Sequence, residues 1–157
     1  MFVELFQFLN LLLSLFKYLT PKQKEQVVDV FVDLFKNIFK SKKDNKESDV
    51  DSTTIQEAVD NITQDQWQGS VVATMAILPS SINEINKRKF TAAMIELVQS
   101  DEFLSELNVR INKIDIKDVD LYTEQCSLEM RRLIAEMIRD KNYKSCKSTE
   151  KYMVLNR

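Results

Sequence analysis

Histidine is absent from this chain of 157 residues, and glycine and proline are nearly absent, with one Gly and two Pro. A single glycine, Gly69, cannot form a phosphate-binding loop or a dinucleotide-binding fingerprint, each of which needs several. All-β and α/β folds also use glycine in their turns, so its scarcity favours an all-helical chain. Without histidine there is no Ser-His or Cys-His nucleophile system, no imidazole base, and little chance of a zinc site.

The two cysteines, Cys126 and Cys146, are far apart in the sequence and do not form a CxxC pair. We interpret them as a buried thiol and a tail thiol in a reducing compartment. The alternative is a single disulfide between them. The first residues, MFVE, lack the basic start and small-residue cleavage site of a secretory signal. The expected location is therefore the cytoplasm, with the membrane surface as an alternative.

The length, composition and net charge of the chain limit its number of domains and its classes of partner. A chain of 18.4 kDa is long enough to bury a core, and one domain is the default. Hydrophobic residues make up 44% and charged residues 29%, as in ordinary globular proteins. The net charge of −2 gives no reason to expect a nucleic-acid partner.

The most unusual part of the sequence is residues 1–40, two apolar segments separated at Thr20-Pro21. Thr20 suits a helix N-cap and Pro21 the first helical position, so a second helix is expected to start there. Polar residues form only a narrow stripe on each segment, and seven of the nine phenylalanines lie within these two helices. The sequence therefore predicts an N-terminal amphipathic helical hairpin with more apolar surface than the hairpin alone can cover.

Eight large apolar side chains of this hairpin form the predicted interaction surface. They are Phe2, Phe6, Phe8, Leu12, Phe16, Phe31, Phe35 and Phe39. Three uses of such a surface compete: the core of a larger bundle, a protein or self-association interface, and an anchor lying in a membrane surface. A spanning helix is disfavoured, because the first segment reaches only about 27 Å and both segments carry charged residues.

Residues 41–53 (SKKDNKESDVDST) are polar, charged with both signs and almost without apolar residues. This composition predicts a linker between the hairpin, 1–40, and a second unit, 54–157. Apolar residues at helical spacing predict about four to five helices in that unit. The expected helices are 54–62, 66–78, 82–99, 102–114 and 121–140, followed by a polar tail.

Several details of these helices are predicted as well. Asp65, Ser80 or Ser81, and Asp101 are candidate N-caps. The segment 66–78 is expected to be the most buried part of the second unit, through the face marked by Trp67, Val71, Met75 and Leu78. The fold class predicted is all-α.

Few residues suggest catalysis. Asp115, Asp118, Asp120 and Glu124 are available as bases, but they stand where a helix N-terminus stabilises acidic side chains. Their spacing lacks the glycine and distal glutamate of a calcium loop. We therefore expect no enzyme activity, no catalytic residues, no metal site and no cofactor.

One short basic run, Lys87-Arg88-Lys89, lies in the third helix of the second unit. Three adjacent cations point in different directions around a helix, so we interpret them as a solvated face.

The function predicted is a non-catalytic helical structural or interaction protein. It docks or self-associates through the aromatic-rich hairpin as a subunit of a larger assembly. The alternative is a peripheral membrane protein that uses the hairpin as an interfacial amphipathic anchor. The expected partner is another protein or a second copy, with a membrane surface second and nucleic acid disfavoured.

Overall fold

A computed structural model describes residues 10, 12, 14–46 and 55–155. Every regular element among them is an α-helix and none is a strand, which confirms the predicted all-α class. The elements run α2 (Pro21–Lys46), α3 (Ile55–Asp60), α4 (Gln64–Ile77), α5 (Glu84–Gln99), α6 (Asp101–Asn112) and α7 (Val119–Leu155). Ahead of α2, residues 14–16 are helical and a turn at residues 17–20 leads into it.

Helix α2 begins where the sequence predicted. Thr20 Oγ1 accepts a hydrogen bond from the backbone N–H of Gln23 at 3.2 Å, and the Gln23 side chain accepts one from the Thr20 N–H at 3.0 Å. This reciprocal pair satisfies two N–H groups that the first helical turn leaves without intrahelical partners. Pro21, the first helical residue, adds a backbone angle already suited to a helix.

The end of α2 corrects the predicted linker. The helix continues to Lys46, so residues 41–46 are helical, and residues 47–53 lie outside the described part of the chain. Lys42 and Lys43 are buried. The Lys42 ammonium donates to the side-chain oxygen of Asn108 at 2.6 Å and of Asn112 at 3.2 Å, which ties this end of α2 to α6. The polar composition of this segment did not indicate that Lys42 and Lys43 are buried in a helix, because the partners of Lys42 come from a distant helix.

The caps of α4, α5 and α6 also differ from the prediction. The N-caps are Thr63, Asn83 and Ser100, in place of Asp65, Ser80 or Ser81, and Asp101. Each of these side chains accepts a hydrogen bond from a backbone N–H three residues later. Because Asp, Asn, Ser and Thr all make good caps, adjacent candidates cannot be ranked from sequence.

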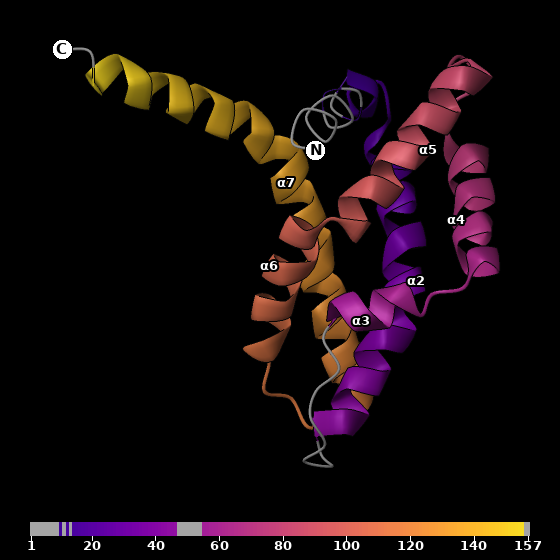
Figure 1. Cartoon of the computed structure of the whole chain (residues 1–157). Helices are drawn as coiled ribbons and strands as arrows, with labels where there is room; N and C mark the ends of the chain where they lie inside the picture. Colours follow the sequence, from indigo (N-terminus) through magenta and orange to yellow (C-terminus); the bar gives the residue numbers. More distant parts are fainter. Residues whose placement is uncertain (1–9, 11, 13, 47–54, 156–157) are drawn as a thin grey trace.

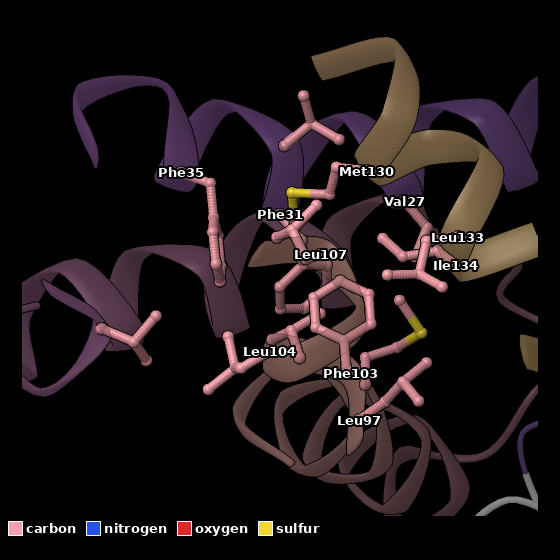
Figure 2. Packing of buried hydrophobic residues seen from close by; sticks show 14 of the residues in the cluster. Val27, Phe31, Phe35, Leu97, Phe103, Leu104, Leu107, Met130, Leu133 and Ile134 are labelled. Atoms are coloured by element: carbon pink, nitrogen blue, oxygen red, sulfur yellow. The ribbon is translucent and has the colours of Figure 1, made fainter. Parts of the chain in front are cut away.

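The core forms around α2, which packs against α3, α4 and α7. In Figure 1, α4 and α5 lie on one side of α2, and α6 lies on the other side against α7. Figure 2 shows Phe31 and Phe35 of α2 gathered with Phe103 and Leu107 of α6 and Met130 of α7. The Phe35 ring lies 6.5 Å from that of Phe103 in an edge-on arrangement, a favourable geometry for two aromatic rings.

Helix α7 is longer than expected. The sequence predicted an end near Asp140 and a tail beyond it, whereas the helix continues to Leu155. Its first half packs on α2 and α6, and the part after about residue 139 projects away from the body (Figure 1).

Candidate interaction surfaces

The predicted surface on the N-terminal segments is largely internal where the structure describes it. Four of its residues have an exposed fraction of 0%: Leu12, Phe31, Phe35 and Phe39. Phe16 is half-buried, and Phe2, Phe6 and Phe8 lie outside the described residues. The four buried side chains are core residues, available to neither a partner nor lipid in this structure. The sequence could not show this, because the helices that cover α2 come from residues 55–139.

Phe16 joins the turn before α2 to helix α5. Its ring stacks on Phe90, with centroids 6.0 Å apart and planes inclined by 25°. The Lys24 ammonium lies 5.9 Å from the Phe16 centroid, a cation–π distance. Two segments more than sixty residues apart in sequence therefore meet at one end of the molecule.

Helix α4 is buried less, and on a different side, than predicted. Of the four residues that marked the predicted face, Leu78 is buried, whereas Trp67, Val71 and Met75 are only half-buried. Within the helix itself the buried residues are Ser70 and Thr74. Val72 points outward with 62% of its surface exposed. The small residues Ser70 and Thr74 face α2 and α5, the helices against which α4 packs. Because the apolar residues in the second half of α4 point in all directions around the helix, the periodicity could not identify the buried face.

The outward face of α4 carries the polar side chains of Asp65 and Gln68 in its first half and small apolar residues beyond them. Gly69, Val72, Ala73 and Ala76 recur at the spacing i, i+3, i+4 and i+7, and all but the half-buried Ala73 are exposed. No charged residue occurs between Asp65 and Glu84 in the sequence. A Cβ placed on Gly69 would meet nothing within 4 Å, so packing within the chain does not require glycine there. We call residues 69, 72, 73 and 76 the α4 face.

Two open grooves flank α2. One, of about 620 Å³, lies between α2 and α7, and the ion pair between Asp29 and Arg131 lies in it. The other, of about 340 Å³, lies between α2 and α3 and is lined partly by the amides of Asn37, Asn61 and Gln66. The first groove mixes charges of both signs. Its Thr123 and Ser127 hydroxyls donate to the backbone carbonyls of Val119 and Thr123.

The four acids considered as bases lie around the start of α7. Asp118 Oδ1 accepts a hydrogen bond from the Leu121 N–H at 2.9 Å, which confirms the capping interpretation for that residue. Asp120 and Glu124 line the α2–α7 groove. Among the residues that the structure describes, no three acidic, cysteine or histidine side chains gather closely enough to hold a metal ion.

Tyr122 and Cys126 are buried on α7 facing α2. Burial, and next the neighbouring Cys126, raise the pKa of the Tyr122 phenol, which keeps it neutral and protonated. The Lys43 ammonium lies 5.6 Å from the centre of the Tyr122 ring. Cys126 is buried, as predicted. We interpret this group as packing, with the ring stabilising the charge of a buried lysine.

Arg110 on α6 is the centre of an ionic cluster with α7. Its guanidinium contacts Glu106 at 3.1 Å, Glu129 at 3.8 Å and Glu136 at 2.5 Å. The hydrogen bond to Glu136 raises the pKa of Arg110 and lowers that of Glu136, because each charge favours the other. The cluster aligns α6 with α7, and sequence analysis did not identify it because its carboxylates come from two helices.

No described helix has a stretch both long and apolar enough to cross a bilayer. Comparisons with protein-family models, with curated proteins and with solved structures returned no match.

Proposed function

We propose that this chain is a non-catalytic helical interaction protein that docks another protein subunit, or a second copy of itself, on the α4 face. The observation that carries this proposal is the exposure of small apolar residues in the second half of α4, beyond its polar first turns, on the outside of the core. Val72 at its centre is 62% exposed. The proposed surface replaces the predicted one because the hairpin side chains that the structure describes are mostly core residues.

A helix segment whose apolar residues point in all directions is normally buried on all sides. Helices α2 and α5 pack against α4, and the buried residues of α4 are Ser70 and Thr74. Val72 and Ala76 in the second half of α4 stay exposed among the residues that the structure describes. Depletion of charge at the centre of a patch is also what distinguishes interface cores from ordinary surface.

The α4 face suits a helical partner. Glycine and alanine allow the backbone of a second helix to approach closely, and Val72 supplies the central apolar contact. A glycine inside a helix costs about 1 kcal/mol relative to alanine. Gly69 carries this cost although none of the residues that the structure describes occupies the space beside it. Close approach of a partner would explain its presence.

The test is the mass of the chain in solution and in an extract of its native source. A double substitution, Val72→Asp with Ala76→Glu, places two carboxylates on the α4 face. We expect wild-type protein to elute above the 18.4 kDa of one chain in at least one setting. The double variant is expected to elute as a folded monomer in both.

The matched control is Val109→Asp on α6, because Val109 is also exposed, at 48%, but lies off the α4 face. It is expected to behave as the wild type does. A wild-type chain that is monomeric in both settings would contradict the proposal. So would a control variant that loses assembly to the same extent as the double variant.

A further inference from the structure

A second surface, at the end of the molecule where residues 16–24 meet helix α5, has a different character. Six cations come from two segments that the Phe16–Phe90 stack holds together. They are Lys17, Lys22, Lys24, Lys87, Arg88 and Lys89. We call these six residues, with Tyr18 and Ile85 on the same two segments, the basic end. It goes beyond the proposed function, because its residues come from residues 16–24 and from α5 and none of them belongs to the α4 face.

The charge of the basic end differs in sign from that of the rest of the chain. Residues 16–25 and 83–92 together hold six cations against two anions, Glu25 and Glu84, a net charge of +4. Because the whole chain carries −2, the remaining residues carry −6. This asymmetry creates a positive potential at one end of an otherwise acidic protein.

Most of these cations are available to a ligand. Arg88 pairs with Glu84 at 3.4 Å, on a surface where both side chains are largely exposed. Among the described residues, no carboxylate lies within ion-pair distance of any of the five lysines. Lys24 contacts the Phe16 ring, and Lys17, Lys22 and Lys89 are exposed.

Two exposed apolar side chains accompany these cations. Tyr18 is 77% exposed in the turn before α2, and Ile85 is 66% exposed in the first turn of α5. An aromatic ring with a polar tip is suited to the boundary between lipid headgroups and acyl chains, and an exposed isoleucine gains from entering it.

From this combination we propose that the basic end docks on a membrane surface containing anionic lipid. The lysines contact headgroup phosphates and carboxylates, and Tyr18 and Ile85 enter the upper acyl region. Lipid is favoured over nucleic acid for two reasons. The cations are mainly lysines, point charges that suit a fluid anionic surface, and the one arginine is already paired. An exposed aliphatic side chain gains nothing against a phosphate backbone.

The first experiment measures partitioning of the full chain onto vesicles by sedimentation at low ionic strength. Vesicles of phosphatidylcholine are compared with vesicles in which one quarter of the lipid is phosphatidylserine. We expect binding to the anionic vesicles only, and release by added salt, because screening weakens surface electrostatics. Each lysine near an anionic surface is worth roughly a factor of five in partitioning. The triple variant Lys17→Gln, Lys22→Gln, Lys89→Gln should therefore bind roughly one hundredfold more weakly.

A matched control changes the charge equally elsewhere, at exposed lysines away from the basic end: Lys40→Gln, Lys113→Gln, Lys117→Gln. It should bind as the wild type does. A second pair of variants tests insertion. Tyr18→Ser with Ile85→Ser should weaken binding several-fold, whereas Val109→Ser with Leu121→Ser, also at exposed apolar residues, should not. Circular dichroism verifies that every variant is folded.

Four results would overturn the proposal. The first is a failure of the wild type to prefer anionic vesicles, and the second is an equal loss of binding in the control triple variant. The third is unchanged binding of the Tyr18 and Ile85 variant, which would mean simple electrostatic adsorption. The fourth is tight binding to heparin or duplex DNA without binding to vesicles, which would identify a soluble polyanion as the occupant.

Discussion

At the scale of single residues, Phe35 was predicted to belong to an interaction surface, but the structure places it in the core. It is fully buried, 6.2 Å from the ring of Phe39 and 6.5 Å from that of Phe103. Sequence identified it as part of an apolar arc wider than an ordinary surface helix needs. It could not decide between the chain's own core and a partner, because both present the same apolar environment to the ring.

Replacing Phe35 with alanine is expected to lower the free energy of unfolding by roughly 3–5 kcal/mol, the sum of lost burial and a residual cavity. Urea denaturation followed by circular dichroism measures this change. The control, Val72→Ala on the exposed side of α4, should change stability by less than about 0.5 kcal/mol. If the Phe35→Ala variant were as stable as the control, Phe35 would not be a core residue, and its assignment to the predicted interaction surface would be supported.

Glu136 gives the chain one predictable dependence on pH. Arg110 holds the pKa of Glu136 below its ordinary value of 4.5 in the folded state. A carboxyl with a lowered folded pKa stabilises the fold above its unfolded pKa, and this contribution is lost as the pH falls through the folded pKa. Because about half of the Glu136 side chain is exposed, solvent screening limits the contribution to about 0.2–1 kcal/mol.

The wild type should therefore exceed Glu136→Gln in stability at neutral pH, and the difference should shrink as the pH falls below the ordinary pKa of 4.5. Denaturation curves across that range measure it. Glu96→Gln serves as a control, because Glu96 is exposed on α5 and belongs to no ion pair among the described residues. A difference that grows as the pH falls would contradict the assigned pairing.

At the scale of elements, sequence predicted which segments are helical better than it predicted where they end. The start of α2 at Pro21 followed from residues adjacent in sequence, and the structure confirms it. The end at Lys46 depends on Asn108 and Asn112, which lie more than sixty residues away. The buried side of α4 depends equally on tertiary neighbours. Local chemistry is visible in a sequence, whereas contacts between distant segments are not.

The two interpretations of residue 41 differ in one measurable consequence. Ser41→Pro would be harmless in a linker, but inside α2 it removes a backbone hydrogen bond and clashes with the carbonyl of Asn37. We expect a loss of about 3 kcal/mol in stability. Ser41→Ala should be neutral or slightly stabilising, because Ser41 is exposed and alanine favours helices. A proline variant that unfolds like the wild type would restore the predicted linker.

The substitution Gly69→Ala on α4 is expected to change stability and assembly in opposite directions. Because a Cβ at this position meets open space, Gly69→Ala should stabilise the isolated chain by about 0.4–1 kcal/mol. The same methyl group should weaken assembly, since it holds a partner helix away from the α4 face. Thermal denaturation measures the first effect and elution volume the second. A variant that gains stability and assembles normally would remove Gly69 from the docking surface.

At the scale of the whole molecule, the predicted division into hairpin and bundle stays a prediction, but the core gives a reason to expect joint folding. Val27, Phe31 and Phe35 of α2 lie in one cluster with Phe103 and Leu107 of α6. Cooperative unfolding is expected when elements share a core in this way.

Residues 54–157 alone should therefore lack a cooperative urea transition, because they expose the side of α6 and α7 that α2 covers. Adding residues 1–46 as a separate peptide should restore the transition and the helical circular dichroism signal. A fragment 54–157 that unfolds cooperatively without the peptide would show that the second unit is a domain in its own right.

The basic end also belongs to this scale. Sequence showed Lys87-Arg88-Lys89 as a short run on one helix, with the lysines of residues 17–24 far away along the chain. Only the fold, through Phe16 and Phe90, joins them. The predicted solvated face covered only Lys87-Arg88-Lys89, of which Arg88 and Lys89 are exposed, and did not include the lysines of residues 17–24.

The length of α7 has a mechanical consequence. From residue 140 to Leu155 the helix extends beyond the body by about 24 Å, at 1.5 Å per residue. It is continuous with the part of α7 that packs against α2 and α6. A rotation of about 10° where it leaves the body would displace its tip by roughly 4 Å. A change in the packing of α7 on α6 would therefore be measurable as a change in distance between a fluorescent label near the tip and one on α6.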